Sequence, residues 1–189
     1  MLDDLARARL IDALWRHPDS ATTSVWAVLD CARDERIYPA LRMSGLDYRC
    51  LYGGRLSPAL EQAAPYLVEL APAYTFASRL IDMGWGRSWG LFLRIADPSN
   101  LRPHLRSLLR VRDESGRVLI FRYYDPRVLR TYLPTCERDE LQAVFGPISS
   151  FMMEGADGDG VIEFAFDGHQ LMERRTSLTG GGTAAVQPA

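Results

Sequence analysis

Ser24-Val25-Trp26-Ala27-Val28-Leu29 contains a continuous apolar run with polar residues on both sides. This pattern is typical of a strand whose two faces are both buried in a core. Before it, apolar residues recur every four positions over residues 2–16, which predicts an amphipathic helix with one buried stripe. After it, residues 33–43 are predicted to form a helix closed by Ser44-Gly45, because glycine tolerates the left-handed conformation that ends helices. A buried strand between two helices indicates an α/β domain.

The same alternation continues along the first half of the chain. We expect strands at 48–52, 66–70 and 90–95, with helices at 74–83 and 101–109. A short helix is predicted to begin at Pro58, because Ser57 is a good cap and proline needs no N–H at the first helical position. Strands that alternate with helices imply parallel pairing in this half of the sheet.

The pattern changes in the second half. Residues 111–112 and 117–121 flank Asp113-Glu114-Ser115-Gly116, which predicts a hairpin, and residues 149–154 and 161–166 flank a glycine-rich turn that predicts a second. Two short helices are expected between the hairpins, at 126–132 and 139–145. The predicted fold class is therefore α/β with a mixed sheet: alternating β and α in the first half, and antiparallel hairpins that add edges in the second half.

The length of 189 residues suits one domain with a small appendage. We divide the chain into an N-terminal helix (1–23), a main domain (24–175) and a tail (176–189). The tail is expected to be disordered, because it is rich in small and polar residues such as Gly180-Gly181-Gly182.

Composition excludes several classes of function. The chain has 22 basic residues, all of them arginine, against 24 acidic residues, and its net charge is −2. A nucleic-acid binder usually carries a clear basic excess, so we expect no nucleic-acid partner. No apolar run approaches the ~18 residues of a membrane span, and the acidic start does not look like a signal peptide. We therefore expect a cytoplasmic protein with no membrane partner.

The chain lacks the spacings of metal and catalytic motifs. His17, His104 and His169 have no second ligand at short spacing, and no GxSxG elbow is present. The three cysteines are too far apart for a zinc site or a disulfide framework, which favours reduced thiols. We predict no catalytic residues, no metal and no cofactor.

Two glycine-containing stretches need separate interpretation. Gly84 to Gly90 matches neither nucleotide-loop pattern, and it is predicted either to display Trp85 and Trp89 as interface anchors or to pack them into the core. Asp157-Gly158-Asp159 resembles the start of a calcium loop, but Gly168 stands where that loop needs glutamate, so a hairpin turn is predicted.

Arg102, Arg106 and Arg110 recur at intervals of four residues on one predicted helix face. They form either a basic ridge for an acidic partner or a face that water solvates. The solvated face is the commoner arrangement and the preferred interpretation.

The densest feature is the block Arg122-Tyr123-Tyr124-Asp125-Pro126-Arg127, where a strand runs into a helix. Asp125 is a good helix cap, and Pro126 suits the first helical position. Arg122 and Arg127 bracket Asp125 and can pair with it, either as a structural clamp or as a contact for a partner. An alternative function is an enzyme or binding protein for an anionic small molecule that uses Arg122, Asp125 and Arg127, which a deep polar pocket would support.

This block carries a resemblance to a known family. Together with Leu133-Pro134 and Phe145-Gly146-Pro147-Ile148, it resembles the signature of the type VI secretion effector-chaperone, or adaptor, family, long treated as a domain of unknown function. Upstream segments agree in order and spacing, among them Trp26 to Asp30 and Tyr48 to Tyr52. The resemblance covers roughly residues 24–154.

The resemblance implies a bacterial cytoplasmic protein that is not an enzyme. Such a protein binds a cognate toxic effector, stabilises it and helps to load it onto a VgrG-type spike protein. The family has no established catalytic residues, so none is carried over. We expect partner contacts from aromatic, arginine and aspartate side chains, namely Trp85, Trp89, Arg122, Tyr124, Asp125 and Arg127.

Overall fold

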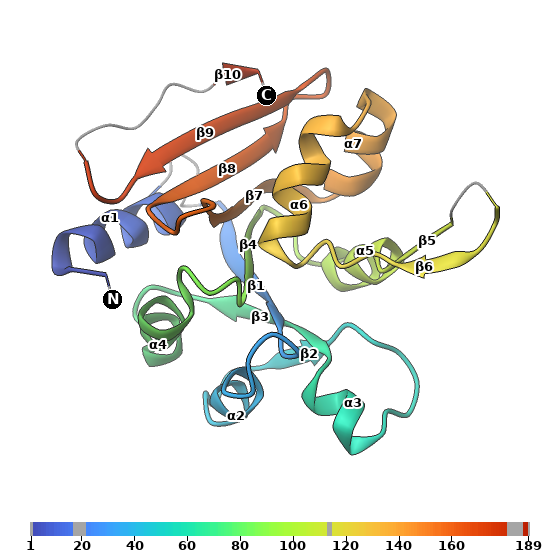
Figure 1. Cartoon of the computed structure of the whole chain (residues 1–189), viewed down its shortest axis with the longest axis horizontal. Helices are drawn as coiled ribbons and strands as arrows, with labels where there is room; N and C mark the ends of the chain where they lie inside the picture. The colour runs from blue at the N-terminus through green and yellow to red at the C-terminus, as the bar shows by residue number, and fades with distance from the viewer. Residues whose placement is uncertain (1, 17–21, 113–114, 181–186, 189) are drawn as a thin grey trace.

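A computed structural model describes residues 2–16, 22–112, 115–180 and 187–188. Within these residues eight strands form one sheet in the order β10-β9-β8-β7-β4-β1-β3-β2 (Figure 1). The strands are β1 (Ser24–Asp30), β2 (Tyr48–Cys50), β3 (Pro65–Leu70), β4 (Gly90–Ile95), β7 (Ile148–Glu154), β8 (Gly160–Phe166), β9 (Leu171–Ser177) and β10 (Gln187–Pro188).

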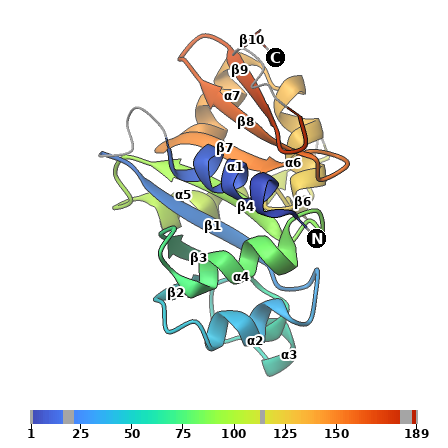
Figure 2. The ribbon, with the colours of Figure 1, turned by 90° about the vertical axis from the view of Figure 1, so that its left-hand side faces the viewer.

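Helices cover both faces of this sheet, so the molecule has three layers (Figure 2). One face carries α1 (Asp4–Trp15), α2 (Ile37–Arg42) and α4 (Thr75–Gly84). The other carries α5 (Leu101–Leu108), α6 (Pro126–Tyr132) with the short 3-10 helix η1 (Leu133–Thr135), and α7 (Arg138–Phe145). The short helix α3 (Pro58–Gln62) lies in the connection between β2 and β3.

Successive residues of the central strands enter opposite cores, as a strand buried on both faces requires. On β4, Leu91 and Leu93 pack with α5, α6 and α7, whereas Phe92 packs with α1, α2 and α4. On β1, Ala27 packs on the side of α1, α2 and α4, and Val28 packs on the side of α5, α6 and α7. The apolar run at 24–29 therefore forms the fully buried strand that the sequence predicts.

The predicted parallel pairing is wrong, because every neighbouring pair in the sheet is antiparallel. β1 and β2 do run in the same direction, but β3 lies between them and pairs with both. β3 and β4 likewise share a direction, with β1 between them. Each helical crossover skips one place in the sheet, which is the split β-α-β arrangement. Local periodicity predicts the helical crossovers, but it does not predict which strand lies between the two strands that each crossover joins.

Most predicted helices are present, with some shifted ends. α6 begins at Pro126 behind its Asp125 cap, and Ser57 caps α3 by accepting from the amide of Leu60. The helix predicted over 33–43 begins only at Ile37, because turns precede it.

The hairpin predicted around residues 113–116 forms, but it adds no edge to the main sheet. β5 (Arg110–Arg112) and β6 (Val118–Ile120) pair only with each other and project from the body of the molecule (Figure 1). The second hairpin, β7–β8, joins the main sheet as expected, but it is not an edge, because β9 and β10 continue the sheet beyond β8.

The end of the chain contains a strand that the sequence analysis missed. β9 pairs with β8 along its whole length, although charged residues occupy its centre. Of the tail expected to be disordered, residues 181–186 and 189 lie outside the described residues. In its described part, Thr176 and Ser177 belong to β9, Leu178 is buried, and β10 pairs with β9.

Candidate functional site

The Arg122–Arg127 block lies at the entrance to α6, where its charges are paired. Arg122 donates to Asp30 over 2.5 Å, and Arg127 donates to both carboxylate oxygens of Asp125 over 2.9 and 2.6 Å. Asp30 ends β1 and is 1% exposed. Two guanidinium groups therefore neutralise two buried carboxylates. We call these four residues the charge clamp, because they fasten the end of β1 to the start of α6.

The electrostatics of Asp125 agree with this geometry. Burial acts to raise the pKa of its carboxyl group, but hydrogen bonds from Arg127 and the positive charges of Arg127 and Arg122 outweigh burial and leave the pKa below its ordinary value. Asp125 also accepts from the backbone N–H of Arg127 over 3.0 Å, which is the helix cap that the sequence predicts.

The two tyrosines of the block are buried beneath the surface. Tyr123 donates its hydroxyl to the carbonyl of Leu105 in α5 over 3.0 Å. The hydroxyl of Tyr124 lies 3.4 Å from that of Tyr52, in the loop after β2. Burial raises the pKa of both Tyr123 and Tyr124. Tyr124 is only 2% exposed, so it positions other elements rather than offering surface to a partner.

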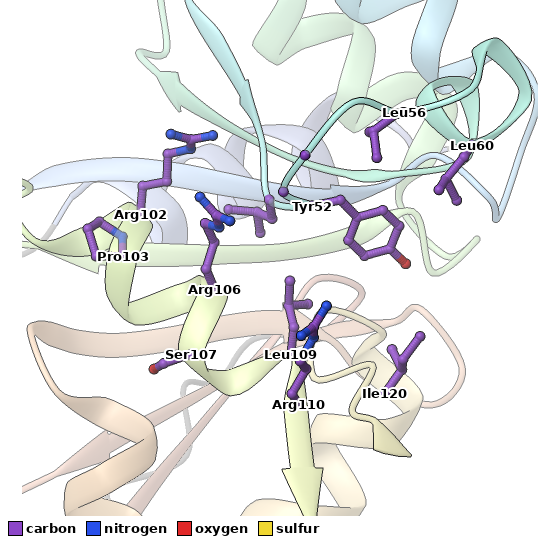
Figure 3. Close-up of a pocket in the computed structure, with 13 residues that line it drawn as sticks. Tyr52, Leu56, Leu60, Arg102, Pro103, Arg106, Ser107, Leu109, Arg110 and Ile120 are labelled. Atoms are coloured by element: carbon purple, nitrogen blue, oxygen red, sulfur yellow. The ribbon is translucent and has the colours of Figure 1, made fainter. Parts of the chain in front are cut away.

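The two elements that these tyrosines hold form the walls of a groove of about 850 Å³ (Figure 3). One wall is α5 together with Arg110, the first residue of β5. The other wall is the segment from Leu51 to α3. The guanidinium groups of Arg102 and Arg106 lie toward one end, and Leu56, Leu60 and Ile120 lie toward the other (Figure 3). We call this feature the arginine groove.

The three arginines line a concave surface, but they do not share one helix face as predicted, because α5 ends at Leu108 and Arg110 begins β5. Arg102 donates to the carbonyl of Cys50 over 3.0 Å, whereas Arg106 and Arg110 are exposed. The guanidinium of Arg106 lies so close to Gly53 that a β-carbon at that position would collide with it. Glycine at 53 thus allows the arginine to lie along the opposite wall.

The two predicted anchor tryptophans lie elsewhere. Both pack with the core beneath α1, α2 and α4, whereas Tyr123 and Tyr124 pack with the core on the other face. Trp89 is buried and donates to Asp34 over 3.2 Å. Trp85 is half-buried and donates to the carbonyl of Gly158 in the β7–β8 turn over 3.0 Å. Core packing is thus the correct alternative for Trp89, and its backbone carbonyl accepts from the N–H of Asp30 in the charge clamp over 2.8 Å.

Sequence reasoning missed the exposed apolar residues of the β5–β6 hairpin. Val111, Val118, Leu119 and Ile120 are all exposed, and Ile120, at 67%, also lines the arginine groove. The available signal was the run Val118-Leu119-Ile120, since a two-stranded ribbon cannot bury both of its faces. Contiguous exposed apolar side chains are characteristic of interaction surfaces.

The histidines and cysteines are the remaining residues considered as candidates for catalysis or metal binding. His104 makes a 2.9 Å hydrogen bond with the carbonyl of Val144, His169 is exposed, and His17 lies outside the described residues. Burial raises the pKa of the free thiol of Cys31 to about 12. Among the residues that the structure describes, no group of three or more His, Cys, Asp or Glu is placed to hold a metal ion. No helix in that part of the chain has the length and apolar character needed to cross a bilayer.

The fold and the site define an α/β protein with an antiparallel sheet between two helical layers and an amphipathic groove on one side. The family model described as "Domain of unknown function (DUF4123)" matches residues 25–143, more than half of the chain, and the chain belongs to this family. The matched region contains the charge clamp and both walls of the arginine groove. Comparison with curated proteins and with solved structures gave no match.

Proposed function

We propose that this protein is a type VI secretion adaptor that binds and stabilises a cognate toxic effector and helps to load it onto a VgrG-type spike protein. It acts in the bacterial cytoplasm and performs no catalysis of its own. Two lines of support are the DUF4123 match and the resemblance of the block at 122–127 to the adaptor signature. The observation that carries the proposal is the arginine groove with its neighbouring apolar hairpin.

The chemistry of this surface suits a protein partner. Arginine and tyrosine are enriched at binding hot spots, and the groove presents both beside exposed leucine and isoleucine side chains. The charge clamp and the two buried tyrosines hold the groove walls in place before any partner arrives. A preformed surface loses less conformational entropy on binding, which favours a stable complex.

The alternative function assigns the charge clamp to an anionic small molecule. Arg122 and Arg127 already donate to Asp30 and Asp125, so the carboxylates neutralise most of the positive charge that would attract an incoming anion. The pairing therefore favours the adaptor over an anion site at this position.

The adaptor function is tested by co-expressing the protein with the effector and the spike protein encoded beside it. The expected result is a complex that stays together on size-exclusion chromatography, and a higher yield of intact effector than without the adaptor. Failure to bind either protein would overturn the proposal. The neighbouring reading frames provide an independent check, since a spike gene upstream and a large toxin gene downstream are expected.

A further inference from the structure

We infer that the arginine groove binds an acidic, amphipathic helix of a protein partner. The inference rests on the proposed function in taking the effector as that partner, and it adds the surface and the chemistry of recognition. It starts from the charge of the groove. Three guanidinium groups line it, and none of the described residues that line it is acidic. Within the described residues, no carboxylate pairs with Arg106 or Arg110, in contrast to Arg122 and Arg127 in the charge clamp.

The other end of the groove is apolar and calls for an apolar face on the occupant. Ile120 on β6 is 67% exposed and Leu60 on α3 is 45% exposed, with Leu56 beside it (Figure 3). Covering such side chains with the apolar surface of a partner is favourable, because it removes them from water. A purely charged ligand would cover the arginines and leave these residues in water.

The spacing of the arginines favours a helix. Arg102 and Arg106 lie one turn apart on α5, which corresponds to about 6 Å along the axis at 1.5 Å per residue. Carboxylates at positions i and i+4 of a helix that packs alongside α5 have the same separation. Apolar side chains at the neighbouring positions of that helix then face Leu60 and Ile120, as in other complexes where a helix fills a groove.

A nucleic acid is the weaker candidate for the same surface. Strand-binding grooves combine basic residues with aromatic rings on which bases stack. Here Tyr52 is the one aromatic residue among the described residues that line the groove, and leucine and isoleucine occupy the other apolar positions. The observations therefore favour a peptide, and the oligonucleotide becomes an outcome of the test.

The probe is a fluorescein-labelled synthetic helix with leucines at i, i+3, i+4 and i+7 and glutamates on the flanking positions, measured by fluorescence anisotropy with the full-length protein. We expect saturable binding that weakens with added salt, because the contacts with the exposed arginines are screened. The same peptide with lysine in place of each glutamate is expected not to bind. Equal binding of both peptides, or stronger binding of a labelled single-stranded oligonucleotide, would overturn the inference.

Matched variants locate the binding surface. Arg106→Glu with Arg110→Glu is expected to weaken binding by about tenfold or more, whereas Arg79→Glu, on exposed α4 surface of the opposite layer, leaves it unchanged. Ile120→Asp is expected to weaken binding similarly, with Met43→Asp, at a 74% exposed position away from the groove, as its control. All five positions are exposed, so the fold is expected to survive, and circular dichroism checks this. Equal effects of groove and control variants would contradict the inference.

The co-expressed effector separates this inference from the proposed function. If wild type binds the effector and the variant with both Arg106→Glu and Arg110→Glu binds it equally well, the adaptor function stands and the groove is not its surface. If the model peptide binds the groove but the neighbouring effector and spike do not bind the protein, the groove inference stands and the adaptor function fails.

Discussion

The guanidinium of Arg122 lies 2.5 Å from the carboxylate of Asp30, although 92 residues separate them in the chain. This contact joins the end of β1 to the first residue of the motif that leads into α6. It also fixes the neighbouring tyrosines, which hold α5 and the loop after β2. The motif therefore affects the shape of the groove indirectly, because it positions the elements that form the groove walls.

Removing Arg122 tests the charge clamp. Arg122→Ala is expected to lower the free energy of unfolding by about 2 kcal/mol, because it leaves the buried carboxylate of Asp30 without its charged partner. Arg122 is itself 46% exposed, which keeps the loss below that of a fully buried pair. Arg49→Ala, which breaks an exposed pair with Asp47, is expected to cost under about 0.5 kcal/mol. Urea denaturation measures both, and similar losses for the two would refute the clamp.

The hydroxyl of Tyr123 is predicted to fix the position of α5. Tyr123→Phe keeps the ring but leaves the carbonyl of Leu105 without this donor, at an expected cost of about 1 kcal/mol in unfolding free energy. Faster amide hydrogen exchange in α5 is expected as well. Tyr74→Phe, at an exposed position, serves as the control and should change neither quantity. Unchanged exchange in α5 would show that the hydroxyl does not position the helix.

A second buried ion pair supports the N-terminal helix. Arg94 pairs with Glu163, donates to Ser150 over 2.9 Å and reaches the carbonyls of Ala13 and Leu14 at the end of α1, each over 3.3 Å. Arg94→Met is expected to cost about 3 kcal/mol in unfolding free energy, because it leaves Glu163 and the end of α1 without their main donor.

A double variant distinguishes charge pairing from packing at this position. Arg94→Met combined with Glu163→Met removes the orphaned carboxylate, so it is expected to recover part of the stability lost in the single variant. The carbonyls of α1 remain without the arginine, so recovery is expected to be incomplete. Full additivity of the two losses in urea denaturation would indicate that the pair contributes no coupling energy.

The buried thiol and phenols predict a loss of stability in alkali. Burial raises the pKa of Cys31 to about 12 and is the main cause that raises the pKa of Tyr132 to about 12, from ordinary values of 9.0 and 10.0. The unfolded chain therefore loses these protons at lower pH than the folded chain does. The stabilisation is complete below about pH 9 and decreases as the pH rises toward 12.

Urea midpoints at pH 7, 9 and 10.5 measure this effect. The midpoint is expected to fall mainly above pH 9, and tyrosinate absorbance is expected to appear together with unfolding. Cys31→Ala removes the thiol whose pKa burial raises to about 12, so it should reduce the pH dependence of stability just above pH 9. A midpoint that is constant up to pH 10.5 would contradict the prediction.

Part of the fold and of the site could be predicted from the sequence because it depends on near neighbours. The apolar run at 24–29 predicts β1, Asp125 and Pro126 predict the start of α6, and the spacing of Asp125 and Arg127 allows the pair that forms. Strand β9 escaped prediction because charged residues interrupt its apolar pattern, and its backbone bonds to β8 decide its conformation.

Contacts between distant segments decided the relative direction of the strands and which residues far apart in the chain lie close together. The sequence alone determined most of the helices and strands, with β9 as an exception, since caps and periodicity act within a few residues. Only the tertiary structure decided that β3 lies between β1 and β2, that Arg122 pairs with Asp30, and that Arg106 faces Gly53 across a groove. These relationships depend on how buried faces of separate elements pack together, and no local pattern of residues records that packing.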